Sequence, residues 1–302
     1  MPLLRKCSAA LLLLACSAWA SNKATFIRPV QQTIPAAGIT QVVVQNLVGP
    51  IEVRIGGGDA ISLVALIHAG GHDDTFARAL SRQLEFSVKN VNGQLQITGE
   101  YPLDHFRDYG YPHMKSVIGI HGTDSNEYMG QKVFVRDVDS QKAVELWAEI
   151  RLTVPARLGL VIRNIYGDIT LNGGIPPAGQ TAGRFDGFTD VGDFTVYRPE
   201  WSSMKIQSSY GKVSFTDGFG ASRNIAVKTN VGSTYFTLPP GANPTFTAHK
   251  DLGFLHNDVS ESSFKKDSDG NSVLQLGDGQ GAKVNVEMSV GSLHLSKVGS
   301  GQ

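Results

Sequence analysis

The sequence carries little charge and no excess of either sign. Its 302 residues include 27 Lys and Arg against 27 Asp and Glu, so the formal net charge is zero, and charged residues make up 18% of the chain. A disordered chain would combine low hydrophobicity with high net charge, and a nucleic-acid-binding protein would carry extra basic residues to neutralise phosphates. With 41% apolar residues and no such excess, the chain is expected to fold around a hydrophobic core and to bind no nucleic acid.

Cysteine is almost absent, and the one long apolar run lies at the N-terminus. Both cysteines, Cys7 and Cys16, lie within the first 20 residues, where two basic residues precede an apolar stretch that ends in Ala-x-Ala at Ala20. This order is typical of a secretory signal peptide, so we predict a signal peptide over residues 1–20 and export of the rest. Cleavage after Ala20 would leave a chain without thiols, in which no disulfide bond can form.

A second processing route stays open at this stage. Leu13–Cys16 resembles a bacterial lipobox, in which the cysteine is lipidated and becomes the first residue of the mature chain. Cleavage after Ala20 would release a lipid-free protein, whereas lipidation of Cys16 would anchor it to a membrane. We therefore expect a periplasmic or cell-envelope location, with membrane contact only if Cys16 is lipidated.

Most of the remaining chain alternates apolar and polar residues over short stretches, which is typical of β-strands with one buried face. Ile61–Ile67 and Val144–Val154 follow this pattern, and the dipeptide Asn92-Gly93 marks a turn between two such stretches. A single stretch, Asp73–Arg82, has helical spacing behind a capping Asp73 or Asp74. The pattern predicts an all-β fold with one short helix.

Eight glycines share a pattern of neighbours. Residues five before, one before, two after and four after are apolar (or Tyr) in seven of the eight cases, and the residue three before is polar in seven of the eight. The inward positions change from odd to even offsets at the glycine, so both arms can face one core only if the chain bends there. Each unit is therefore predicted to be strand, glycine corner, strand. The glycines are Gly49, Gly93, Gly167, Gly192, Gly211, Gly232, Gly253 and Gly291.

The spacing of these glycines suggests the architecture. From Gly167 onward the intervals are 25, 19, 21 and 21 residues, followed by one of 38 that would hold two units. A period of about 20 residues favours a β-solenoid, in which each coil buries its apolar face against the next, and a β-sandwich is the alternative. We predict one domain, with an N-terminal part over 21–100, an irregular insertion over 101–142 and a repeated β part over 143–299.

Four segments of the sequence resemble a known family. Ala148–Leu171 resembles the core signature of the bacterial DUF4097 family of adhesin-like proteins, with a strand ending in Val-Pro-Ala, alternating apolar residues and an Asn-x-x-Gly-x-Ile sequence. The segments Val44–Arg54, Val227–Pro239 and Val286–Lys297 are similar to the same family's repeats. The resemblance covers most of Gln41–Lys297 and implies an exported, β-helix-like envelope protein without a catalytic motif. The family gives no account of the insertion.

The insertion carries the best candidates for a binding site. It lacks clear periodicity but is rich in aromatic and histidine residues, whose rings could stack on a sugar, contact a protein partner or form a small satellite core. The candidate ligand-binding residues are Tyr101, His105, Tyr109, Tyr111 and His113.

Metal binding is weakly indicated. Together with His105 and His113, the side chains of His121, Asp104 and Asp108 could supply metal ligands. The spacing of the histidines matches no compact ligand motif, so we expect no metal and no cofactor. Asp267–Asn271 resembles part of a calcium loop, but a tight turn explains it better. His249 and His256, seven residues apart across Gly253, are expected to be surface residues on the two arms of one corner.

No nucleophile motif is present, so catalysis would have to rest on the residues that follow the glycines. Asp168, Asp193 and Lys212 would lie on adjacent units, where they could form a carbohydrate-cleaving or calcium-assisted site, or be ordinary exposed turn residues. We predict a non-catalytic, adhesin-like envelope protein that binds a polymer or a protein partner. The alternatives are a carbohydrate-active enzyme of the β-helix kind and a regulatory partner in envelope stress.

Overall fold

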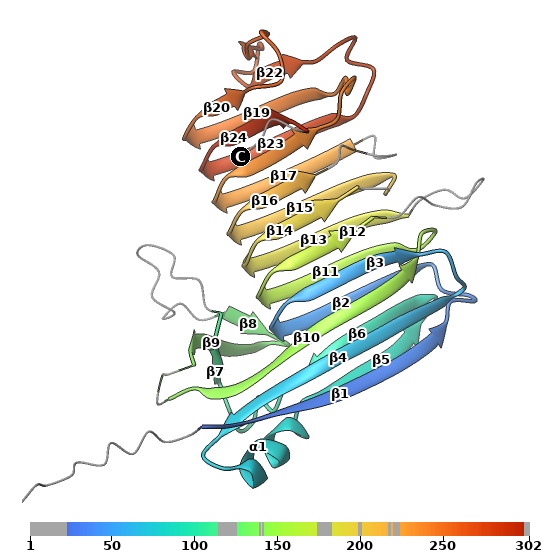
Figure 1. The fold of residues 1–302 in the computed structure, drawn as a ribbon, viewed down its shortest axis with the longest axis vertical. Coiled ribbons are helices and arrows are strands. Elements are labelled where there is room, and N and C mark those ends of the chain that lie inside the picture. Colours follow the sequence, from blue (N-terminus) through green and yellow to red (C-terminus); the bar gives the residue numbers. More distant parts are fainter. Residues whose placement is uncertain are drawn as a thin grey trace, which may run out of the picture.

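The computed structural model describes residues 23–113, 126–138, 140, 142–173, 183–198, 201–216, 219 and 224–298. Within these residues the chain forms 24 strands and one helix, and the strands make two mixed sheets of 13 and 11 strands (Figure 1). The predicted all-β class is confirmed. The two sheets share one hydrophobic core and fit both a solenoid and a sandwich description.

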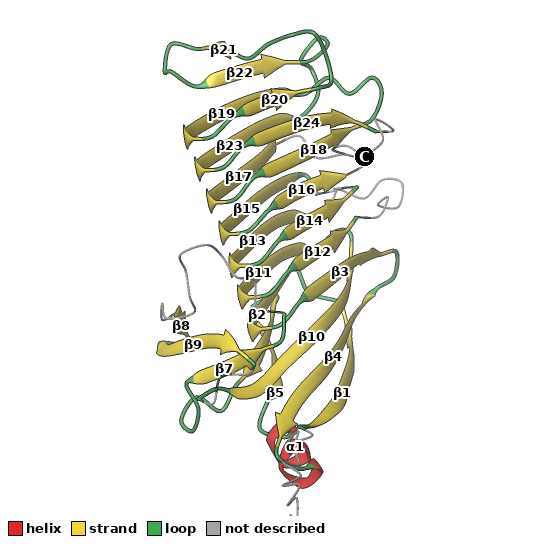
Figure 2. Ribbon diagram, turned by 60° about the vertical axis from the view of Figure 1, so that its left-hand side comes forward, coloured by secondary structure: helices red, strands yellow, loops and turns green. Residues whose placement is uncertain are grey.

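Strands on either side of a glycine form the centre of both sheets. In each such segment the first strand joins the 11-stranded sheet and the second joins the 13-stranded sheet, and neighbouring segments pair in parallel (Figure 2). The segments in chain order are β2 (Gln41–Val48) with β3 (Ile51–Gly56), β11 (Gly159–Tyr166) with β12 (Ile169–Asn172), β13 (Arg184–Val191) with β14 (Phe194–Tyr197), β15 (Ser203–Tyr210) with β16 (Val213–Thr216), β17 (Asn224–Val231) with β18 (Thr234–Leu238), β19 (Thr245–Leu252) with β20 (Leu255–Asn257), and β23 (Lys283–Val290) with β24 (Leu293–Lys297).

Seven of the eight patterned glycines lie where the chain passes from one sheet to the other. Their φ angles run from 120° to 159°, and a Cβ placed on any of them would lie only 1.6–2.3 Å from a carbonyl oxygen of the neighbouring segment. Only glycine allows the segments to approach so closely. In spatial order this glycine column is Gly49, Gly167, Gly192, Gly211, Gly232, Gly291 and Gly253.

A row of buried polar side chains lies three residues before the glycines. Asn164 donates from Nδ2 to the carbonyl oxygen of Gly49 (2.9 Å), and the Thr189 hydroxyl donates to that of Gly167 (3.2 Å). The polar residue that the sequence pattern shows at this inward position therefore satisfies backbone oxygens at the corner, which would otherwise be buried without a partner. The row consists of Asn46, Asn164, Thr189, Ser208 and Thr229.

The order of the segments in space differs from their order in the chain. β23 lies between β17 and β19, and β24 lies between β18 and β20. The interval of 38 residues between Gly253 and Gly291 was expected to hold two units, and that expectation is wrong. It holds an excursion through β21 (Lys265–Lys266) and β22 (Ser272–Gln275), which pair antiparallel beyond β19 and end the 11-stranded sheet.

The opposite end is closed by antiparallel strands. β10 (Val144–Pro155) pairs with β3 in parallel and with β4 (Ala60–Gly71) in antiparallel fashion, and β1 (Ala24–Pro35) forms the edge beyond β4. In the other sheet β6 (Gln94–Glu100) pairs with β2 and with β5 (Glu85–Val91). The eighth patterned glycine, Gly93, lies in the β5–β6 turn behind Asn92, which also has a positive φ, so its assignment to a corner is wrong.

The short helix agrees with the prediction from the sequence, whereas the insertion differs from it. Helix α1 (Asp74–Ser81) has Asp73 as its N-cap, with the carboxylate accepting from the amide of Phe76 (2.7 Å), as predicted. The insertion is less irregular than expected, because its described part contains the strands β7 (Asp108–Tyr111), β8 (Asn126–Tyr128) and β9 (Gln131–Asp137). These strands extend the 13-stranded sheet from the start of β10. β7 and β8, with four and three residues, are too short to give a clear alternating pattern, and in β9 the apolar Phe134 stands between the buried Val133 and Val135.

The glycine column can be tested with a single added methyl group. Gly167→Ala would place a Cβ 2.3 Å from the Gly49 carbonyl oxygen at a φ of +131°, so we expect a loss of about 3 kcal/mol or more in the free energy of unfolding. At Gly57 an added Cβ meets nothing within 4 Å, and Gly57→Ala should cost less than about 0.5 kcal/mol. Urea denaturation measures both, and equal stability of the two variants would contradict the role assigned to the column.

Candidate functional site

Three of the predicted site residues form a buried aromatic cluster. Tyr101 contacts Tyr109 edge to face at 5.3 Å between ring centroids, and Tyr128 from β8 packs against Tyr101 at 5.9 Å. Tyr111 packs in the same manner on Trp147 of β10 at 5.4 Å. The three candidate tyrosines are thus core residues, and the cluster holds the insertion against the two sheets.

The cluster is tied to the first glycine corner by hydrogen bonds. The Tyr101 hydroxyl donates to Oδ1 of Asn46 and to the carbonyl oxygen of Val48, each at 3.0 Å, and accepts from the Val48 amide at 3.3 Å. The Tyr128 hydroxyl donates to the carbonyl oxygen of Gly99 (2.7 Å). These contacts fix the positions of Tyr101 and Tyr128 relative to the two sheets.

Burial also changes the acidity of these phenols. It raises the pKa of Tyr101, Tyr109, Tyr111 and Tyr128 well above the ordinary value, and it raises the pKa of Tyr166, the β11 residue beside Tyr111, to about 12. The phenols are therefore neutral hydrogen-bonding groups at any physiological pH.

The two predicted histidines lie apart from each other. His113 contacts Tyr111 and Trp147 on the outer face of the 13-stranded sheet, whereas His105 lies at the mouth of a cavity beside Pro102. Both side chains are exposed. The structure therefore brings Tyr101 and His105 to one cavity but does not gather all five candidates, and the ligand-binding role of the five stays a prediction.

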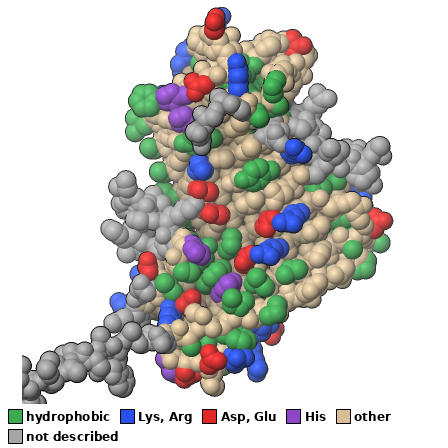
Figure 3. Space-filling model, viewed as in Figure 1, with side chains coloured by type: hydrophobic (Ala, Val, Ile, Leu, Met, Phe, Trp, Pro, Cys, Tyr) green, Lys and Arg blue, Asp and Glu red, His purple; other side chains and the backbone are tan. Residues whose placement is uncertain are grey.

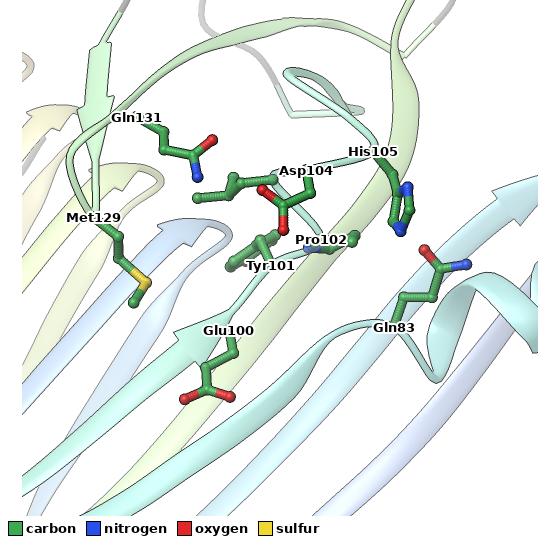
Figure 4. Close-up of a pocket in the computed structure, with 9 residues that line it drawn as sticks. Gln83, Glu100, Tyr101, Pro102, Asp104, His105, Met129 and Gln131 are labelled. Carbon is green, nitrogen blue, oxygen red and sulfur yellow. The ribbon is translucent and has the colours of Figure 1, made fainter.

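The cavity has a volume of about 690 Å³ and opens to solvent (Figure 4). Its floor is the start of the insertion, and its walls come from the loop after α1, the end of β6 and the β8–β9 turn. Asp104 and Gln131 lie on opposite sides of the cavity (Figure 4). The lining residues are Gln83, Glu100, Tyr101, Pro102, Leu103, Asp104, His105, Met129 and Gln131.

Two features of the β8–β9 wall set this cavity apart. Met129 has a φ of 52°, which is unusual for a residue with a side chain, and its side chain is 57% exposed. Oε1 of Gln131 is buried and has no hydrogen-bond partner. A buried acceptor without a partner costs about 1–3 kcal/mol, which a ligand donor could recover. Sequence reasoning missed Gln83, Met129 and Gln131, because nothing in the sequence shows that these distant residues meet.

The residues that follow the glycines lie on adjacent segments, and the contacts between them join backbone amides to side chains. The Asp193 amide donates to Oδ1 of Asp168 and the Lys212 amide donates to Oδ1 of Asp193, both at 2.8 Å. The hydroxyls of Ser233 and Ser292 accept backbone amides in the same way further along the column. Both aspartates thus have a structural role, in which each side chain holds the next segment in register.

The other polar clusters are turns or surface groups. In Asp267–Asn271 the Asp267 Oδ1 atom accepts the amides of Asp269 (3.0 Å) and Asn271 (2.8 Å), which is the geometry of a tight turn. Within the described residues, no three His, Cys, Asp or Glu side chains come together in an arrangement that could hold a metal ion. The remaining metal candidate, His121, lies outside the described residues, as do Cys16 and Ala20. No helix in the described part of the chain is long and apolar enough to cross a membrane.

Comparison with known proteins gives similar solved structures but no family. No family model matches the chain, and no curated protein matches its sequence. A proposed cell adhesion protein from Clostridium sporogenes is 12% identical with a TM-score of 0.47, and the match covers 90% of this chain and 100% of that one. A proposed adhesin from Bacteroides fragilis is 10% identical with a TM-score of 0.36, over 89% of this chain and 97% of that one.

The third structure is a proposed lipid-binding protein from Parabacteroides distasonis, 10% identical with a TM-score of 0.23, over 90% of this chain and 97% of that one. None of the three similarities assigns a family or a ligand to the chain.

The buried phenols make the stability of the protein sensitive to alkaline pH. Their pKa values are higher in the folded chain than the ordinary value of about 10, so their contribution is complete below pH 10 and is lost as the pH rises toward the folded values, about 12 for Tyr166. We expect the melting temperature to fall between pH 10 and pH 11.5, and less steeply for Tyr101→Phe than for the wild type. Thermal melts at stepped pH measure this, and identical slopes would contradict it.

Proposed function

We propose that this chain is an exported, non-catalytic envelope protein of the adhesin-like kind, and that it binds an envelope polymer or a protein partner in the cavity beside Gln131. We also assign its sheets to one β-solenoid of the DUF4097 type. The glycine column supports this assignment, because segments that pair in parallel and bend at one line of residues are how a solenoid stacks its coils.

The unpartnered Oε1 atom of Gln131 is the observation that carries the binding proposal. Gln131 lines an open cavity whose other polar groups include the carboxylates of Glu100 and Asp104. Such a set of acceptors suits a ligand that offers hydroxyl or amide donors, and it disfavours an anionic ligand. Pro102 and the exposed Met129 add apolar surface on which the body of a sugar or a peptide could rest.

The supporting structure is rigid where the ligand would bind. Tyr101 and Tyr128 under the cavity are buried and hydrogen-bonded to the strands below, so the site is organised before a ligand arrives. A preformed site binds with a smaller loss of conformational entropy than a mobile one. This arrangement fits adhesion better than a reaction that needs closure around a substrate.

Gln131→Leu separates binding from stability. Because Oε1 makes no hydrogen bond in the folded chain, its removal should leave the melting temperature unchanged or raise it, and should weaken binding at least tenfold, about 1.4 kcal/mol. Asp104→Ala should also weaken binding, whereas Gln207→Leu and Glu261→Ala, at surface positions away from the cavity, should not. Two assays measure binding for each purified variant. The first measures binding to soluble envelope polysaccharide, and the second measures chemical cross-linking to envelope proteins.

Two results would contradict this proposal. One is wild-type affinity in Gln131→Leu, and the other is the absence of any bound polymer or protein. Release of reducing ends from the polysaccharide, abolished by Asp168→Asn, would instead establish the enzyme alternative.

Export is tested on the mature N-terminus. In a bacterial host the protein recovered from the envelope should begin at Ser21, or at Cys16 with an attached lipid, and intact-mass spectrometry distinguishes the two. A Cys16→Ser variant should change the mass only in the second case. A chain that still begins at Met1 would contradict export.

A further inference from the structure

Three rings stand in a row at the C-terminal end of the 13-stranded sheet. Tyr235 of β18, His294 of β24 and His256 of β20 are direct neighbours in the strand register. Their ring centroids are 4.6 Å apart at both steps, with angles between the ring planes of 6° and 13°. This separation matches the usual spacing of neighbouring strands, so the rings are held in a stack by the sheet itself. We call these residues the ring row.

The ring row is a local feature of this end of the sheet. The same register position is held by Thr170, Thr195 and Ser214 on β12, β14 and β16, so rings replace small hydroxyl side chains only from β18 onward. Beyond the row, the Phe254 ring lies 6.1 Å from that of His256 and is 69% exposed.

Exposed aliphatic side chains lie at the glycine corners that adjoin the ring row. Leu252 and Val290, which directly precede two glycines of the column, are 65% and 45% exposed. At the other end of the column the corresponding residues, Val48 and Tyr166, are buried, and there Tyr101 and Tyr111 of the insertion pack beside them. Figure 3 shows hydrophobic and histidine side chains together at the upper left, over the corner where β20 and β24 begin.

The geometry of the ring row selects the chemistry of its ligand. Because the rings cover one another's faces, they present their edges, which offer a phenol hydroxyl and imidazole nitrogens at an interval of about 4.6 Å. Phe254 and Leu252 offer apolar surface beside these edges. A sugar ring has the matching pair of surfaces, with hydroxyls around its rim and C–H groups on its face, and polar groups repeated at a constant interval suit a polymer.

The charges around the row favour a ligand without charge. Lys212 lies at one end, with Nζ 5.9 Å from the centroid of the Tyr235 ring, and Asp258 follows β20 at the other end. Burial and the neighbouring His256 lower the pKa of His294, so this ring is neutral at pH 7. Nucleic acid or an anionic lipid surface would need an excess of positive charge, which this surface lacks.

We propose that the ring row, together with Phe254, Leu252 and Val290, binds the strand of an uncharged polysaccharide. This site goes beyond the proposed function, because it lies at the end of the sheets opposite the cavity and involves none of its residues (Figure 1). It gives the protein a second contact surface with a ligand class of its own.

Affinity electrophoresis of the full mature chain tests the proposal. Native gels each contain one soluble neutral polysaccharide (hydroxyethylcellulose, xyloglucan, dextran or laminarin) or the anionic polymer alginate. We expect retardation by at least one neutral polymer and none by alginate. Phe254→Ala and His256→Ala should each weaken it at least tenfold. Tyr197→Ala and His249→Ala, which remove exposed rings outside the row, should leave it unchanged.

The controls separate this site from the cavity. Gln131→Leu should keep the retardation, and Phe254→Ala should keep any binding that depends on Gln131, so either proposal can fail while the other stands. Absence of retardation in every neutral gel would overturn the polysaccharide site, as would equal losses in Tyr197→Ala and Phe254→Ala. Concentration-dependent self-association that Phe254→Ala abolishes would assign the surface to a second copy of the chain instead. Unchanged melting curves show that the variants fold.

Discussion

The close approach of successive segments at the glycine column is the constraint on which the rest of the structure depends. At each corner a Cβ would overlap the carbonyl oxygen of the neighbouring segment, so no other residue allows the same spacing. Once the corners are stacked, the parallel pairs between neighbouring glycine segments have their register set, and the buried polar row reaches the corner carbonyls. The outer positions then also repeat from segment to segment, which places Asp168 beside Asp193 and Tyr235 beside His294.

The two ends of this stack differ in a way that bears on function. At the N-terminal end antiparallel strands and the tyrosine cluster cover the first corners, and the cavity forms where the insertion joins the sheets. At the C-terminal end the corner side chains stay exposed and the ring row lies on the sheet beside them. Between the ends, the register position of the ring row is held by the short hydroxyl side chains of Thr170, Thr195 and Ser214.

The sequence predicts the centre of this fold well and its ends poorly. The change from odd to even inward offsets at a glycine is a local signal, and it correctly locates seven corners. Gly93 has the same neighbours because β6 also packs against the core, although a hairpin and not a corner precedes it. Burial of Tyr101 and Tyr109 depends on contacts between distant segments, and so does the cavity, whose Gln83 and Gln131 come from separate elements. No local pattern could indicate either.

The placement of the final segment between two earlier ones has a consequence for assembly. β17 and β19 do not pair with each other, since β23 lies between them and follows both in the sequence. Segments that pair with the one before them in the sequence can be added one by one only as far as β18. β19 can join the parallel stack only once β23 is in place. The last segments of the stack therefore form as one unit, and the order of folding there departs from the order of the sequence.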